Sequence, residues 1–226
     1  METTKTTKSI AQIFEEFLAD QEGRISAKTL SKYESIIHLY RSYLESYWPG
    51  HDGESDKVTK AGGTYCSTFG PEDAIEGYSE FLGYFMPRKV MCGEETMRGA
   101  GTVTKKLAKW MAEKGYIEDT EDAQERAGEA AKDLPNAQTV LDILNAYCDE
   151  TAPVRHGGEI EDHFYIDRIE PGKLWLSPLT AGNSVIGPIP VPKQVTALCE
   201  PGWDIGGVVA KVGKGWRLVE VWNVSP

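Results

Sequence analysis

The stretch "SAKTLSKYESIIHLYRSYLESYW", residues 26–48, has the clearest secondary-structure pattern in the chain. Its apolar and aromatic residues recur at intervals of three and four, which is the spacing of one face of an α-helix. Ser26 stands at the start as a helix cap, and Pro49 and Gly50 end the pattern. The stretch therefore predicts an amphipathic helix whose core-facing residues are Leu30, Tyr33, Ile37, Tyr40, Leu44 and Tyr47.

The same helical period extends through residues 1–150. Residues 50–71 interrupt it, because they are rich in Gly, Ser, Thr and Asp and have no period, so we expect a long surface loop there. Besides the helix at 26–48, the predicted helices are one from the cap Ser9 to near Gly23, one over 72–85, one that ends at Gly115, and one capped by Asn136.

The pattern changes after residue 157 to short β-rich runs separated by turn residues. Five such strands in about 70 residues predict a small closed sheet, because closure hides strand edges. The segment "GKGW", residues 213–216, predicts a tight hairpin turn. The expected fold class is α+β with two domains: an all-α helical bundle at 1–150, a linker at 151–157, and a small all-β barrel, SH3-like or similar, at 158–226.

Composition and charge limit the function classes. The chain has 226 residues and a net charge of −11, and residues 1–150 carry −10 of it. No apolar run approaches the ~18 residues that a membrane span needs, and the amino end has no secretory h-region. The four cysteines never form a C-x-x-C pair, so we interpret them as reduced thiols. These features favour a cytoplasmic protein without membrane partners.

Three segments of the helical half, "SIAQIFEEFLADQ", the stretch at 26–48 and "TMRGAGTVTKKLAKWMAEKGYIE", carry a resemblance to a known family. Together they resemble the SAM-like core-binding domain at the amino end of tyrosine recombinases, the phage integrase family. The resemblance covers residues 9–118 and implies a DNA-binding helical bundle. Its matching positions are Ser26, Thr29, Tyr33, Trp110, Gly115, Tyr116 and Ile117.

The recombinase catalytic domain is not found in this sequence. That domain needs several arginines, a His-x-x-Arg motif and a tyrosine nucleophile near the carboxyl end. The last tyrosine here is Tyr165, and the single His-x-x-Arg match, His38 to Arg41, lies inside the helix at 26–48, so we attribute it to chance. There is also no Walker loop, Gly-x-Gly-x-x-Gly or Gly-x-Ser-x-Gly. We therefore expect no catalytic residues, no cofactor, no metal and no enzyme activity.

The candidate functional residues form a split basic face. Lysines one turn apart on the helix at 26–48 share a stripe, and a second basic group lies on the helix that ends at Gly115. In the family that the chain resembles, helices at these places contact DNA phosphates. The alternative interpretation is that these lysines only form a solvent-exposed helix face without a partner. The predicted nucleic-acid-binding residues are Lys28, Lys32, Arg98, Lys105, Lys106 and Lys109.

Two other groups have plain structural explanations. The junction residues His156, Glu159, Glu161, Asp162 and His163 could supply metal or acid–base chemistry, but they fit a polar linker and a first strand better. The tryptophans of the β domain are expected mainly in its core rather than on a docking surface. The first hypothesis is a non-catalytic protein that binds double-stranded DNA, with the barrel recruiting a protein partner or dimerising. The alternatives are a protein-interaction adaptor without DNA affinity and, third, an enzyme of unknown type.

Overall fold

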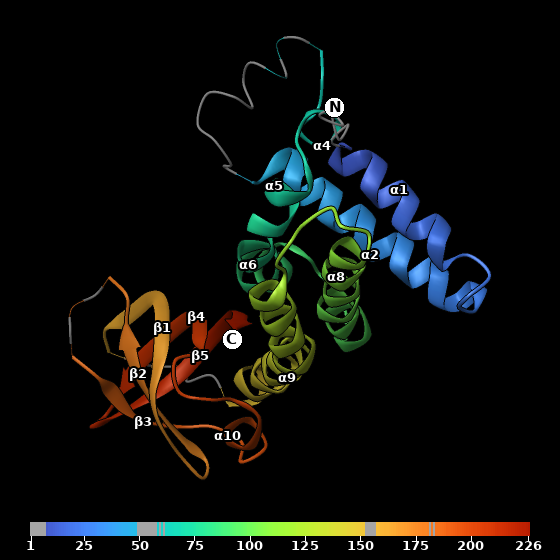
Figure 1. Ribbon diagram of the computed structural model, residues 1–226. Helices are drawn as coiled ribbons and strands as arrows, with labels where there is room; N and C mark the ends of the chain where they lie inside the picture. The colour runs from blue at the N-terminus through green and yellow to red at the C-terminus, as the bar shows by residue number, and fades with distance from the viewer. Residues whose placement is uncertain are drawn as a thin grey trace, which may run out of the picture. The chain divides into compact units, whose positions relative to one another are not determined.

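The computed structural model describes residues 8–48, 58, 60, 62–151, 157–180, 182 and 184–226. Helices come first and an antiparallel sheet of five strands follows, so the coarse α+β prediction is confirmed (Figure 1). The chain forms two compact units, and neither is continuous in sequence. Unit 1 comprises Met1–Met86 and Arg98–Ala131, and unit 2 comprises Pro87–Met97 and Lys132–Pro226.

The first two helices, α1 (Ile10–Gln21) and α2 (Ala27–Ser46), are capped as predicted. The hydroxyl of Ser9 accepts a hydrogen bond from the Gln12 backbone N–H at 3.4 Å, and that of Ser26 accepts from Thr29 at 3.2 Å. Such caps stabilise a helix by about 1 kcal/mol each. Most apolar residues of both helices enter the core of unit 1, where the buried ring of Tyr40 contacts the rings of Phe14, Tyr43, Tyr78 and Phe81. The prediction that Tyr47 faces the core is wrong, because it follows the last residue of α2 and is 50% exposed.

The single helix predicted over 72–85 is instead a series of short helical segments. Gly77, between the first two segments, permits close packing on α2, because a Cβ there would come within 2.9 Å of the Tyr40 hydroxyl oxygen. That hydroxyl donates to the carbonyl oxygen of Ala74, which holds α2 against this region. A short helix, α4 (Tyr65–Thr68), also lies inside the predicted loop. The segments are α5 (Pro71–Glu76), α6 (Tyr78–Glu80), the π-helical η1 (Phe81–Phe85) and α7 (Met86–Lys89).

The helix that precedes Gly115 is α8 (Glu94–Glu113), and Gly115 follows it with φ +69°, as a C′ glycine should. The prediction of a helix that starts at Asn136 is wrong. Helix α9 (Glu121–Thr151) begins in the acidic, alanine-rich segment and passes through Pro135. Alanine has the highest helix propensity and acidic residues stabilise a first turn, so this segment extends the helix past the proline.

Helices α8 and α9 cross at very short range within unit 1. A Cβ on Gly101 of α8 would lie 2.3 Å from the backbone nitrogen of Ala131 and 2.6 Å from the carbonyl oxygen of Ala127, both on α9. Only glycine permits that approach. Ala100, Ala108, Ala123 and Ala127 are also buried, which shows how small residues let the two helices pack closely.

The five predicted strands are confirmed, and all neighbours in the sheet pair antiparallel. The order is β3-β2-β1-β4-β5, and the short helix α10 (Val195–Leu198) lies between β3 and β4 in the chain. The predicted hairpin turn is confirmed at Gly213, which has φ +61°, and Lys214, since β4 ends at Val212; Gly215 and Trp216, which the prediction placed in the turn, instead begin β5. The strands are β1 (Glu159–Glu170), β2 (Lys173–Pro178), β3 (Ile186–Pro190), β4 (Asp204–Val212) and β5 (Gly215–Ser225).

The sheet is open over the described residues, so the predicted barrel is not confirmed. No hydrogen-bond ladder joins β3 to β5 in the described part of the chain, although Cα atoms of these two strands approach within 8 Å. Pro188 and Pro190 lie on β3, which suits an edge strand because proline cannot donate to a ladder.

The core of unit 2 lies between the sheet and the second half of α9. Val140, Leu144 and Cys148 of α9 are buried in one cluster with strand residues such as Phe164 and Ile205. The apolar core of the sheet therefore extends across residue 150, the position at which the sequence predicted the helical domain to end.

Candidate nucleic-acid interface

The exposed side of α8 is basic from Arg98 to Lys109. The opposite side supplies Val103, Leu107 and Met111 to the core, which leaves the polar residues of the same turns at the surface. No Asp or Glu occurs in α8 between Arg98 and Glu113. The exposed residues of this side are Arg98, Thr102, Lys105, Lys106 and Lys109.

The Lys106 side chain connects this side of α8 to α2. Its ammonium lies 5.6 Å from the centre of the Tyr33 ring, and that ring stacks on Phe17 of α1 with an interplanar angle of 9°. A second contact joins the same two helices, since a Cβ on Gly99 would lie 3.5 Å from Ile36. Helices α2 and α8 are therefore packed neighbours within unit 1.

Lys28 and Lys32 are exposed on α2, one turn apart. On the helical wheel both lie on the same side of Ile36, which faces α8: Lys32 is about 40° and Lys28 about 80° around the helix from it. The acidic Glu34 lies about 200° around the helix from Lys32, at 100° per residue. The structure thus places the two predicted basic groups on adjoining helices, on either side of the α2–α8 contact.

Several of these basic side chains also have local contacts. The Lys105 ammonium lies 2.8 Å from where a Cβ on Gly128 would stand, so its stem lies along α9. Lys109 pairs with Glu113 at 3.7 Å, but both side chains are about two-thirds exposed, and such pairs contribute at most about 1 kcal/mol. A phosphate could therefore displace Glu113 at little cost.

Lys114, at the end of α8, belongs to a structural contact instead. Its ammonium pairs with the Asp20 carboxylate at 2.7 Å and with Glu16 at 3.7 Å, and it lies over the Trp110 ring. The hydrogen bond from Lys114, followed by that from Trp110, lowers the pKa of Asp20. Two carboxylates thus neutralise this lysine, and it ties α8 to α1.

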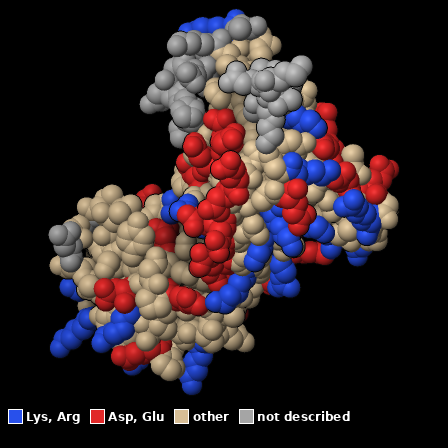
Figure 2. Space-filling model, in the orientation of Figure 1, with Lys and Arg blue, Asp and Glu red and all other residues tan. Residues whose placement is uncertain are grey.

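An acidic surface borders the basic one in unit 1. Figure 2 shows Asp and Glu side chains gathered in a band over α5 and α6, with Lys and Arg side chains beside it over α8. The first half of α9 adds further exposed carboxylates. The exposed acidic residues of these helices are Glu72, Glu76, Glu121, Asp122, Glu125 and Glu129.

The junction cluster is divided by the pleat of β1. Asp162 is buried and accepts hydrogen bonds from the Thr180 backbone N–H at 2.8 Å and hydroxyl at 3.0 Å. His163 lies on the other face, with Nδ1 2.8 Å from the Asp204 carboxylate, which also accepts from Arg88 at 3.1 Å. Glu159 and Glu161 are exposed, and His156 lies outside the described residues. Across the described residues, no three His, Cys, Asp or Glu side chains are placed to hold a metal.

The aromatic residues of unit 2 divide between core and surface. Phe164 and Trp203 are buried, while Trp175 is half-buried beneath the Arg168 guanidinium, 3.6 Å from its ring centre. Tyr165 and Trp222 are 46% and 39% exposed. Part of the aromatic set is therefore available at the surface.

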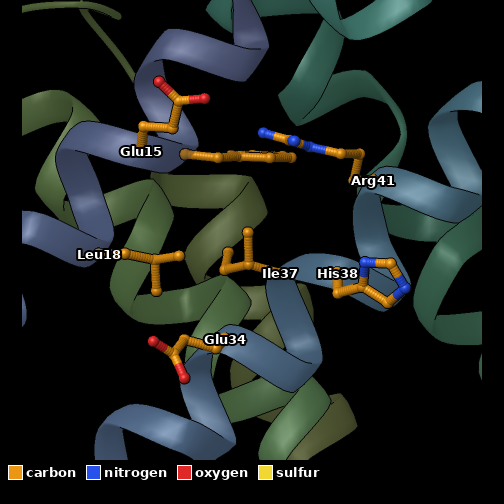
Figure 3. Close-up of a pocket in the computed structure, with 7 residues that line it drawn as sticks. Glu15, Leu18, Glu34, Ile37, His38 and Arg41 are labelled. Atoms are coloured by element: carbon orange, nitrogen blue, oxygen red, sulfur yellow. The ribbon is translucent and has the colours of Figure 1, made fainter.

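A pocket of about 190 Å³ lies between α1 and α2, and the sequence did not predict it. Phe14, Leu18 and Ile37 give it apolar walls, and its charged residues are Glu15, Glu34, His38 and Arg41. The His-x-x-Arg match thus lies at this pocket. Figure 3 shows Glu15 and Arg41 at one end and Glu34 at the other, with Leu18 and Ile37 between them.

Comparison with known proteins finds no matching family model, no matching curated protein and no matching solved structure. In the part of the chain that the structure describes, no helix is both long and apolar enough to cross a membrane.

Proposed function

We propose that this protein is a non-catalytic DNA-binding protein that holds the phosphate backbone of duplex DNA on its α2–α8 basic face. This face consists of Lys28, Lys32, Arg98, Lys105, Lys106 and Lys109. The observation that carries the proposal is the contact between Lys106 and Tyr33, because it makes two separate basic stripes into neighbours. The resemblance of residues 9–118 to the integrase core-binding domain agrees with this use of the helices.

The chemistry of the face suits sequence-independent binding. Lysine ammonium groups neutralise phosphates and release condensed counterions, which supplies affinity but reads no base. The hydroxyl of Thr102 is already used, since it donates to the Arg98 carbonyl oxygen at 2.8 Å. Within the basic face, Arg98 is the residue best suited to contact a base, because a guanidinium can form two hydrogen bonds with a guanine edge.

A salt titration tests the proposal. With four to six phosphates neutralised, the logarithm of the association constant should fall against log salt with a slope of about −4 to −5. Fluorescence anisotropy with a labelled duplex measures that slope. The variant K105E/K106E/K109E should bind at least about tenfold more weakly at low salt, while its melting temperature stays close to that of the wild type.

A matched control separates the basic face from net charge. The variant K193E/K211E/K214E makes the same change in charge at exposed lysines of unit 2 and should keep most of the affinity. Absence of binding by the wild type at low salt, or equal loss in both triple variants, would refute the proposal.

The second candidate function is a protein-interaction adaptor without DNA affinity. The acidic band over α5 and α6 favours it, because DNA is repelled there and a basic protein surface is attracted. In either function, unit 2 would recruit a partner, and its exposed Tyr165 and Trp222 are the side chains suited to that role.

Two finer features belong to the same proposal. The sheet would curl into a small barrel, supported by the approach of β3 to β5 within 8 Å. The protein would work in the cytoplasm, supported by its four free cysteines, since a reducing compartment keeps thiols unpaired.

A further inference from the structure

We infer that the pocket between α1 and α2 binds a basic amino acid with a free α-amino and α-carboxylate group, of which lysine is the simplest example. The pocket is smaller than the roughly 300–1,000 Å³ of sites for drug-sized ligands, so its occupant is small. The inference rests on how its charged and apolar groups are arranged, and it is independent of the basic face.

One end of the pocket matches a zwitterion. Glu15 of α1 and Arg41 of α2 stand there together (Figure 3). Neither side chain has a hydrogen bond or an ion pair with any of the described residues. A guanidinium binds a carboxylate and a carboxylate binds an ammonium, so these groups of opposite sign at one end of the pocket fit the head of an amino acid.

The middle and the far end determine the side chain of the ligand. Leu18 and Ile37 present aliphatic surface, which suits a methylene stem. Glu34 lies at the far end, seven residues before Arg41 and so roughly 10 Å away along the helix axis. Its carboxylate is likewise unpaired among the described residues. A four-methylene stem with a hydrogen bond at each end spans that separation and brings a second ammonium to Glu34.

The charge balance agrees with this ligand. Glu15, Glu34 and Arg41 together carry one negative charge, and lysine carries one positive charge at neutral pH. A neutral amino acid would leave the Glu34 carboxylate without a partner. His38 is exposed beside Arg41 on the pocket wall, and the proposed binding of lysine does not involve it.

Chemical-shift titration of the full chain with L-lysine tests the inference. We expect saturable shifts at residues of α1 and α2 with a Kd on the order of 1 mM. Because Glu34 and Glu15 are exposed, L-norleucine, which lacks the distal ammonium, and 6-aminohexanoate, which lacks the α-ammonium, should each bind about two- to fivefold more weakly. E34Q should remove the preference for lysine over norleucine, and E15Q or R41Q should weaken both ligands.

The controls distinguish this site from the DNA face. Lys32 lies on the side of α2 opposite the pocket, so K32E should leave lysine binding unchanged. E34Q, in turn, should leave DNA binding unchanged. Arg41 is half-buried, so if R41Q disturbs the fold, R41K serves as the alternative variant that keeps the charge. Circular dichroism checks that each variant is folded. The inference would be overturned if the wild type showed no saturable shift up to about 20 mM lysine, which is a tenfold or larger excess over the expected Kd. Equal binding of lysine and norleucine by the wild type would also overturn it.

Discussion

Replacing Gly101 by alanine should separate helix propensity from helix packing. The added Cβ would lie 2.3 Å from the Ala131 nitrogen, more than 1 Å inside the roughly 3.5 Å optimum for non-bonded atoms. Overpacking of this kind costs about 1–3 kcal/mol or more, and both clashing groups are backbone, which cannot rotate away. The alanine gains about 1 kcal/mol of helix propensity in return. We expect a net loss of about 2 kcal/mol.

Gly99→Ala is the matched control, two residues away on the same helix. Its Cβ would meet Ile36 at 3.5 Å, an ordinary van der Waals contact, so only the gain in propensity remains, about 0.5–1 kcal/mol. For a chain of this size, G101A should lower the melting temperature by about 4–8 °C and G99A should raise it by about 1–4 °C. Calorimetry and urea unfolding measure both. A G101A variant as stable as the wild type would refute the close approach of α8 and α9.

Three other measurements check separate parts of the structure. Burial raises the pKa of the Cys148 and Cys199 thiols to about 11 and raises the pKa of Cys66 further. A thiol reagent at pH 8 should therefore label these cysteines slowly until guanidinium unfolds the chain, and rapid labelling of the native protein would contradict their burial. Hydrogen bonds from Lys8 and then Tyr116 lower the pKa of Glu16 below its usual 4.5, so its contribution to stability should be present above pH 4.5 and lost as the pH falls through the lowered pKa; E16Q should flatten that part of the stability–pH curve. Arg88→Ala removes one partner from the Asp204 carboxylate, which is 8% exposed, and should destabilise unit 2 by about 1–3 kcal/mol in urea unfolding. The control Lys173→Ala loses only an exposed contact with Glu170 at 4.0 Å and should have nearly no effect.

Elements with a local signal could be predicted from the sequence. Ser26 and the spacing of Tyr33, Ile37 and Tyr40 fix α2, because a cap and a buried seam are properties of one segment. The strands of unit 2 and the turn at Gly213 follow from local patterns in the same way.

Features that depend on a partner segment could not be predicted. Gly101 weakens a helix when α8 is considered alone, yet it permits the crossing with α9, and nothing in its own sequence neighbourhood indicates that. Pro135 suggests a helix boundary, but tertiary packing on both sides continues α9 through it. For the candidate site, the lysine stripes were visible in the sequence, whereas their adjacency and the pocket at Glu15 and Arg41 required the packing of α1, α2 and α8.

The interleaved units have a consequence for synthesis on the ribosome. Pro87–Met97 emerges in the middle of unit 1 but belongs to unit 2, and the second half of α9 follows before any strand exists. A nascent chain that has reached Thr151 holds every residue of unit 1, yet it exposes the apolar side of α9 at Val140, Leu144 and Cys148 until the last strand is made. During that interval the helix is a natural substrate for a chaperone, and a premature stop after Thr151 would release a fragment prone to aggregate.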